Sequence, residues 1–192
     1  MRDRARAGAD AGFSAAGARP TRTRRCEEFL PRDTHYDWAG MSQDFAGQLN
    51  QQPEGWVQAM GMTITLATKD EVRAELTVGH QHLQAYGIVH GGVHCGVIET
   101  LASIGAYLFA RERGQHVVGL ENTTSFIRAV RAGAKLHAIA LPITRGRRTQ
   151  VWQANVLDED ERIMASGRVR LLCLEADQEL AGEQVKGELH QG

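Results

Sequence analysis

The chain has 192 residues, which is enough for one domain with a hydrophobic core and too few for two domains of ordinary size. Its formal net charge is −1, so no overall basic field favours nucleic acid as a partner. The three cysteines are widely spaced and form no CxxC pair, which fits a reducing cytoplasm better than a disulfide framework.

Residues 1–40 mix Arg, Ala and Gly without helical or strand periodicity, which predicts a disordered leader. Residues 1–25 hold seven arginines and almost no large apolar side chain, so we expect no secretory signal there. One hypothesis makes Met41 the true start of the protein. The alternative is a transit-like or nucleic-acid-binding arm, which acidic residues such as Asp3 and Glu27 disfavour. N-terminal mass spectrometry of the native protein distinguishes the two.

A short helix is expected next. Ser42 is a good N-cap, Phe45 and Leu49 are spaced i, i+4, and Pro53 is a stop signal.

Two stretches of alternating hydrophobicity, roughly 60–66 and 72–78, predict a hairpin with one exposed face. A long helix is expected from about Gly92 to Arg111. Four further alternating stretches separated by short turns predict strands over roughly 117–128, 134–143, 148–157 and 162–173.

Short turns force antiparallel pairing, and a helix that is apolar all round must be enclosed. We therefore expect an α+β fold over residues 41–174, in which a curved antiparallel sheet wraps around one long buried helix. Residues 175–192 are expected to form a polar tail. Homo-oligomerisation is expected to complete the burial of the helix. Glu99 and several small residues argue against a membrane-spanning helix.

Glu99 is the only normally ionised residue among the seventeen from His94 to Ala110. Burying a carboxylate is costly unless a nearby interaction compensates, so this position is a functional candidate. The alternative is a structural acid paired with an arginine of another strand, such as Arg128.

Gly91 and Gly92 lie at the predicted start of the long helix, where backbone N–H groups have no partner within the helix. These donors and the helix dipole form a site for a polarised carbonyl oxygen. Ser103, at i+4 from Glu99, is a candidate for holding water, and Gln84 in the preceding loop for orienting a carbonyl. The alternative for both residues is ordinary helix-surface and loop chemistry.

Four histidines, His80, His82, His90 and His94, fall within fifteen residues, but their spacing matches no closed metal site. We expect His90 to donate a hydrogen bond that fixes its own loop.

Arginines gather at the ends of two predicted hairpins, where the alternative is a solvated turn. Together they are candidates for binding the phosphates of a carrier such as coenzyme A. These residues are Arg128, Arg145, Arg147 and Arg148.

The run from Tyr86 to Val93, with the His-Gly-Gly sequence, and the run from Ile98 to Ser103 resemble the signature of hot-dog-fold acyl-CoA thioesterases. The closest groups are the phenylacetyl-CoA-type enzymes and the 4-hydroxybenzoyl-CoA thioesterases with Glu on the central helix. The Gly146-Arg147-Arg148-Thr149 turn is also similar, and the resemblance covers about residues 55–174.

The resemblance implies homotetramers built from dimers, with active sites at the dimer interface. By position, Glu99 matches the catalytic carboxylate, Gly91 or Gly92 the polarising amide, and Gln84 the loop amide. Ser103 matches a water-placing residue contributed by the neighbouring subunit. His94 and Cys95 stand where aromatic and small residues are expected beside the acyl pocket.

The expected function is a cytoplasmic acyl-CoA thioesterase without metal or bound cofactor, and without nucleic acid or membrane partners. Glu99 would attack directly or activate water. The alternatives are acyl-thioester hydration or dehydration with His90 as base, and a non-catalytic acyl-CoA-binding or regulatory protein. Glu99→Gln separates the last of these from an enzyme, since it removes hydrolysis and largely keeps binding.

Overall fold

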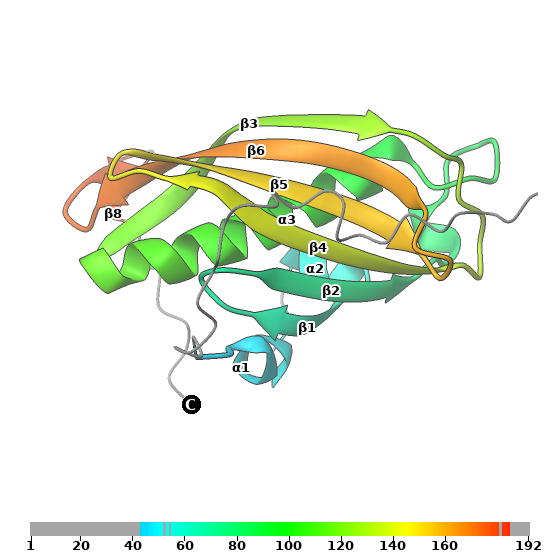
Figure 1. Cartoon of the computed structure of the whole chain (residues 1–192), viewed down its shortest axis with the longest axis horizontal. Helices are drawn as coiled ribbons and strands as arrows, with labels where there is room; N and C mark the ends of the chain where they lie inside the picture. Colours follow the sequence, from blue (N-terminus) through cyan, green and yellow to red (C-terminus); the bar gives the residue numbers. More distant parts are fainter. Residues whose placement is uncertain (1–42, 52, 54, 181, 185–192) are drawn as a thin grey trace, which may run out of the picture. The chain divides into compact units, whose positions relative to one another are not determined.

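The computed structural model describes residues 43–51, 53, 55–180 and 182–184 (Figure 1). Internal contacts divide the chain into Met1–Thr34 and His35–Gly192, and every described residue belongs to the second unit. The predicted leader, with Met41 and Ser42, lies outside the described residues.

Six antiparallel strands form one sheet that curves over a single long helix, which confirms the expected fold class (Figure 1). The two hairpin strands lie at one edge, and the third strand of the chain lies at the other. In spatial order the strands are β1 (Thr63–Ala67), β2 (Val72–Thr77), β4 (Lys135–Arg145), β5 (Thr149–Asp158), β6 (Ile163–Glu175) and β3 (Gln115–Phe126).

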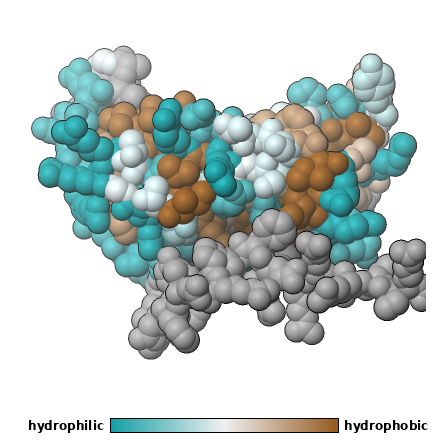
Figure 2. All heavy atoms as spheres, turned by 45° about the horizontal axis from the view of Figure 1, so that its top comes forward, coloured by the Kyte–Doolittle hydropathy of each residue, from teal (hydrophilic) through white to brown (hydrophobic). Residues whose placement is uncertain are grey.

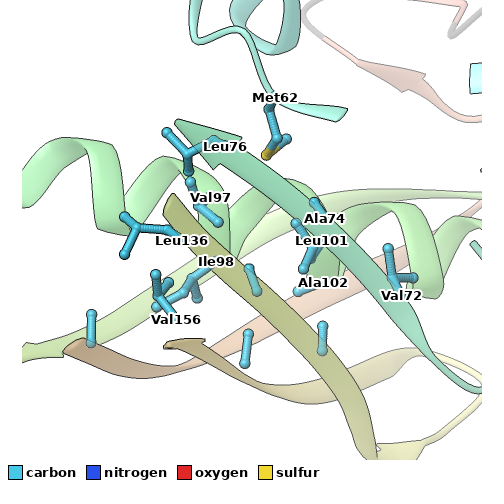
Figure 3. Close-up of a cluster of buried hydrophobic side chains, with 14 of the residues drawn as sticks. Met62, Val72, Ala74, Leu76, Val97, Ile98, Leu101, Ala102, Leu136 and Val156 are labelled. Carbon is cyan, nitrogen blue, oxygen red and sulfur yellow. The ribbon is translucent and has the colours of Figure 1, made fainter. Parts of the chain in front are cut away.

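Helix α3 (Gly91–Ala110) packs against β2 to β6, and its apolar side chains form the centre of the core. Figure 3 shows Val97 and Ile98 of α3 beside Leu136, with Leu76 and Val156 of neighbouring strands close by. Burial of these side chains is the main favourable term that holds helix and sheet together. The core therefore fixes α3 along the inner face of the sheet.

By length and composition, the helical segment Gly91–Arg113 is the one stretch among the described residues that is apolar enough to cross a membrane. More than half of its apolar 18-residue window is buried inside the protein, and its first twenty residues pack against the sheet. This helix is therefore the buried central helix of the domain. Glu99 and the small residues of the segment had predicted this.

In its described residues, the segment before β1 contains two short helices, of which the sequence predicted one. Helix α1 (Ala46–Gln51) begins beside Asp44, whose Oδ1 accepts hydrogen bonds of 2.9 Å from the N–H groups of Ala46 and Ala67. One side chain thus caps α1 and ties it to β1. Helix α2 (Gly55–Ala59) was not predicted, because Pro53 was interpreted only as a stop signal.

Two details of the strands differ from the prediction. A bulge between Ile64 and Leu66 shifts the register of β1, so that Ala67 is fully buried and Leu66 only half-buried. The predicted polar tail also contains a two-strand hairpin, β7 (Glu179–Leu180) and β8 (Glu183–Gln184).

Candidate functional site

The loop between β2 and α3 is held by His82, whose side chain is 1% exposed. Its Nδ1 accepts a hydrogen bond of 2.8 Å from the N–H of Gly79, and its Nε2 lies 2.9 Å from the carbonyl oxygen of Met60. Because a carbonyl only accepts, Nε2 carries the proton. His82 is thus a structural residue that ties the loop to the segment before β1.

His90 is the N-cap of α3. Its Nδ1 accepts a hydrogen bond of 2.9 Å from the N–H of Gly92, so the ring accepts here instead of donating as predicted. The Gly92 amide is thereby occupied. The N–H of Gly91 has no acceptor among the described residues, which leaves it as the free donor at the helix start.

A cavity of about 450 Å³ lies at this helix start. It is bordered by the loop before α3, the first turn of α3 and the segment that follows β3. Five residues chosen from the sequence line it together: Gln84, His90, Gly91, Gly92 and Arg128. Apolar side chains complete much of the wall, and they include Ile88, Val89, Phe126 and Ile127.

Glu99 is half-buried under β3, where two neutral groups hold its carboxylate. Asn122 Nδ2 donates to Oε2 over 3.0 Å, and Ser103 Oγ donates to Oε1 over 3.4 Å. Arg128 is not its partner, because Arg128 Nη1 donates to the carbonyl oxygen of Ile163 over 2.6 Å. The alternative of a Glu99–Arg128 ion pair is therefore wrong.

Asn122 and Gly119 of β3 complete the Glu99 environment, and neither was predicted. Asn122 Nδ2 also donates to the carbonyl oxygen of Cys95 over 3.1 Å, and its Oδ1 accepts from Thr124 Oγ1 over 2.6 Å. A Cβ on Gly119 would lie 2.5 Å from Glu99 Oε1, so the missing side chain makes room for the carboxylate. The only sequence signal was a polar residue inside a strand that faces the helix.

Glu99 does not line the cavity at the helix start. Seven residues separate it from Gly92, which corresponds to about 10 Å along the axis of α3 at 1.5 Å per residue. Within a single chain, the Glu99 carboxylate and the glycine amides therefore do not line the same cavity.

The four candidate arginines lie near opposite ends of α3. Arg128 borders the cavity at the N-terminal end. Arg145 stacks on Phe109 near the C-terminal end, and its Nη1 contacts Asp70 Oδ1 at 2.6 Å. Arg147 and Arg148 are exposed in the adjacent turn. A single phosphate site built from all four arginines of one chain is thus excluded.

The segment from residue 86 to 165 matches the family model described as Thioesterase superfamily. A protein of Mycobacterium tuberculosis strain H37Rv that carries a provisional esterase name is 40% identical over 119 residues, which are 61% of this chain and 84% of that protein. The chain belongs to the thioesterase superfamily.

Solved structures agree with this assignment. A thioesterase of Haemophilus influenzae superposes with a TM-score of 0.64 at 32% identity, covering 70% of this chain and 93% of that one. The PaaI protein of Escherichia coli superposes with a TM-score of 0.59 at 20% identity, covering 66% and 89%, which supports the hot-dog fold. The chain is therefore a thioester hydrolase with a hot-dog fold.

The histidines of this thioesterase have separate environments. His82 holds the loop, His90 caps α3, and His94 is buried 6.2 Å from the ring of Phe126. In the part of the chain that the structure describes, no group of three His, Cys, Asp or Glu residues is placed to hold a metal ion. Cys95 is half-buried and Cys173 is buried, and both are free thiols.

Proposed function

We propose that this thioesterase hydrolyses acyl-CoA thioesters to a free acid and coenzyme A, with Glu99 as the catalytic carboxylate. The observation that carries the proposal is the free N–H of Gly91 at the end of a helix, in a cavity that also holds the Gln84 side chain. A 1,4-dihydroxy-2-naphthoyl-CoA hydrolase of Escherichia coli supports a CoA substrate, since it is 34% identical over 105 residues, which are 55% of this chain and 76% of that protein.

The carbonyl oxygen of the thioester would accept a hydrogen bond from Gly91 N–H, and the helix dipole would stabilise the negative charge that develops there. Glu99 would then act in one of two ways. Direct attack forms a mixed anhydride that water hydrolyses, while general-base action removes a proton from an attacking water. In both routes the C–S bond breaks, the thiolate of coenzyme A leaves with its electron pair, and the acid is released.

The site requires two chains in this proposal, because Glu99 does not line the cavity and lies about 10 Å from Gly92 along its own helix. Strand β3 has a neighbour on one side only and exposes Leu120, with Phe126 and Ile127 at its end, at 50%, 58% and 48%. Figure 2 shows hydrophobic patches among polar groups on the face of the molecule that is in view. An unpaired apolar edge favours pairing with a second copy about a two-fold axis.

In that dimer, Glu99 of the partner subunit would face the cavity of the first chain. Two dimers would then associate into a tetramer. The proposed enzyme acts in the cytoplasm on a soluble CoA thioester, uses no metal or bound cofactor, and has no nucleic acid or membrane partner. Arg128 lines the cavity that holds the proposed carbonyl site. Arg147, whose Nη2 lies 3.7 Å from Glu175 Oε1, and Arg148 are exposed and would contact a phosphate elsewhere on the assembly.

The test is thiol release from a panel of aromatic and aliphatic acyl-CoAs by the full chain and by Glu99→Gln. Loss of the carboxylate should lower kcat by about a hundredfold or more, while binding of the acyl-CoA is largely kept. Glu112→Gln is the matched control, because Glu112 is exposed and forms a surface ion pair with Lys69.

Other results of this test point to the rival functions. Binding without hydrolysis of any acyl-CoA in the wild type would favour a non-catalytic acyl-CoA-binding protein. Addition or removal of water across a carbon–carbon double bond, detected by mass spectrometry, would favour a hydratase. His90 would then be the base only after its ring released the Gly92 N–H, because accepting that hydrogen bond at Nδ1 leaves the proton on Nε2.

A further inference from the structure

Trp56 is a large apolar side chain that the domain leaves partly exposed, at 38%. It belongs to the short helix α2, and its indole lies against α3 at Gly96, where a Cβ would clash with the ring. The carbonyl oxygen of Trp56 accepts from Met60 N–H over 3.0 Å, and the carbonyl oxygen of Met60 contacts His82 Nε2 over 2.9 Å. The loop that leads into α3 thus holds the helix that carries Trp56.

A second tryptophan shows which side of α3 this indole covers. Trp152 of β5 lies against Gly105 in the same manner, but it is fully buried. Nine positions separate Gly96 from Gly105, which is about two and a half turns of a helix with 3.6 residues per turn. The two glycines therefore face opposite sides of α3. Because Gly105 faces the sheet, Trp56 covers the side that faces away from it.

On that side of α3, the indole of Trp56 is a neighbour of Glu99. It occupies the place of a side chain at position 96, and side chains three positions apart on a helix are neighbours, with Cβ atoms about 5–6 Å apart. The Glu99 carboxylate lies at the level of the Cys95 carbonyl, because Asn122 Nδ2 donates to both groups. Carboxylate and indole thus lie at about the same level of α3, held by β3 and by α2.

Charge indicates which part of a thioester would meet the indole. The cavity at the helix start contains Arg128 and suits the phosphate-bearing coenzyme A. Near Glu99, the half-buried neighbours on α3 are small and uncharged. They are Cys95, Gly96, Thr100 and Ser103. Glu99 would repel a phosphate here, whereas an apolar acyl group would cover the exposed part of the indole.

We infer that Trp56 is a specificity-determining residue that contacts the acyl part of the thioester next to its carbonyl. The inference rests on the proposed thioesterase function. In the proposed dimer, the carbonyl held at Gly91 would meet both Glu99 and Trp56 of the partner subunit. Because the indole stands beside the carboxylate, it limits the width of the acyl group at the carbon next to the carbonyl. The favoured substrates are unbranched acyl chains and aryl groups without an ortho substituent.

Matched substrates that differ by one methyl group beside the carbonyl test this limit. The pairs are made on the skeletons that the wild type hydrolyses, such as benzoyl-CoA with 2-methylbenzoyl-CoA and hexanoyl-CoA with 2-methylhexanoyl-CoA. The readout is kcat/KM of the methylated member divided by kcat/KM of the other, so that the intrinsic reactivity of each thioester cancels between variants. Trp56→Ala should raise this ratio by about tenfold or more, since one methylene group in a hydrophobic pocket changes kcat/KM by about 10–200-fold.

Two further variants separate this role from the packing of α2. Trp56→Phe keeps a smaller ring against Gly96 and should raise the ratio by less than Trp56→Ala, which also covers the case in which the Ala variant does not fold. Val57→Ala is the matched control, because Val57 is the next residue of α2 and packs against the hydrophobic core. It should lower stability and leave the ratio unchanged.

A ratio that both Trp56 variants leave unchanged, or that Val57→Ala raises as much, overturns the inference while the thioesterase function stands. Absence of thiol release from the whole acyl-CoA panel rejects the proposed function instead. Calorimetric binding of the two pairs to the wild type and to Trp56→Ala then decides the role of Trp56. A Kd ratio that Trp56→Ala shifts towards the methylated member supports that role, and an unchanged ratio or no binding rejects it.

Discussion

Asn122 and Glu99 are joined by a 3.0 Å hydrogen bond from Nδ2 to Oε2 that links the edge strand β3 to the central helix α3. The same amide nitrogen contacts the carbonyl oxygen of Cys95, and Thr124 holds the amide oxygen. The Asn122 side chain is thus fixed at both ends. Its donor keeps the Glu99 carboxylate in one orientation without supplying a positive charge.

Asn122→Ala should therefore lower kcat by about tenfold to a hundredfold and change KM little, because it releases a positioned carboxylate without removing it. Steady-state kinetics on the acyl-CoA that is hydrolysed most efficiently measure kcat and KM separately. Thr124→Val should have a smaller effect of the same kind, since it loosens Asn122 indirectly. Equal losses in KM and kcat, or a larger effect at Thr124, would contradict the positioning role.

A second prediction concerns packing between α3 and β5. Trp152 is fully buried, and its ring lies against Gly105, where a Cβ would clash with the indole. Gly105→Ala should lower the free energy of unfolding by about 1–3 kcal/mol through overpacking. Urea unfolding measures the change. Gly47→Ala in α1 is the control, because its Cβ would meet open space and should be neutral or stabilising.

The pH dependence of stability should carry a contribution from His94. Burial lowers its pKa in the folded protein below the ordinary value of 6.5, so the unfolded chain takes up the proton first on acidification. The contribution of His94 to the free energy of unfolding is complete above about pH 6.5. It is lost as the pH falls from there towards the pKa of His94 in the folded protein.

Urea unfolding at several pH values between 8 and 5 measures this effect. His94→Phe should lose less stability than the wild type over the acidic part of the range, at no more than about 1.4 kcal/mol per pH unit for one group. His116→Phe serves as the control. Identical slopes for His94→Phe and the wild type would show that His94 does not titrate differently on folding.

The sequence predicted the elements of the sheet and the central helix because their periodicity is a local property. It also singled out Glu99, the lone ionisable residue in an apolar run. Asn122 and Gly119 could not be found in this way, since their role depends on how β3 lies over α3. The bulge at Leu66 was missed for the same kind of reason, because register is set between strands.

The candidate arginines show the same limit of prediction from sequence. Arg128 and Arg145 both follow or end strands, and residue type gave no reason to separate them. The strand order places one near each end of α3, and Asp70 engages Arg145. The functions of His82 and His90 were likewise hidden, since a histidine that pins a loop and one that caps a helix look alike in sequence.

The proposed dimer makes a prediction about Cys95. If the two-fold axis is perpendicular to α3, the two copies of α3 are antiparallel, and a residue four positions before the axis faces one four positions after it in the partner. Gly91 and Glu99 are equidistant from Cys95, so the axis must pass near this residue if they act on one carbonyl.

The two Cys95 thiols should therefore be close enough to be joined by a short bis-maleimide in the full chain carrying Cys26→Ser, because Cys95 is half-buried and Cys173 is buried. We expect a cross-linked dimer on a denaturing gel, with a yield independent of protein concentration, and no such band when Cys95→Ala is added. Light scattering of the untreated protein establishes that dimers are present. Dimers that never cross-link at Cys95 would place the axis elsewhere and reject a site shared between Gly91 and Glu99 of the partner subunit.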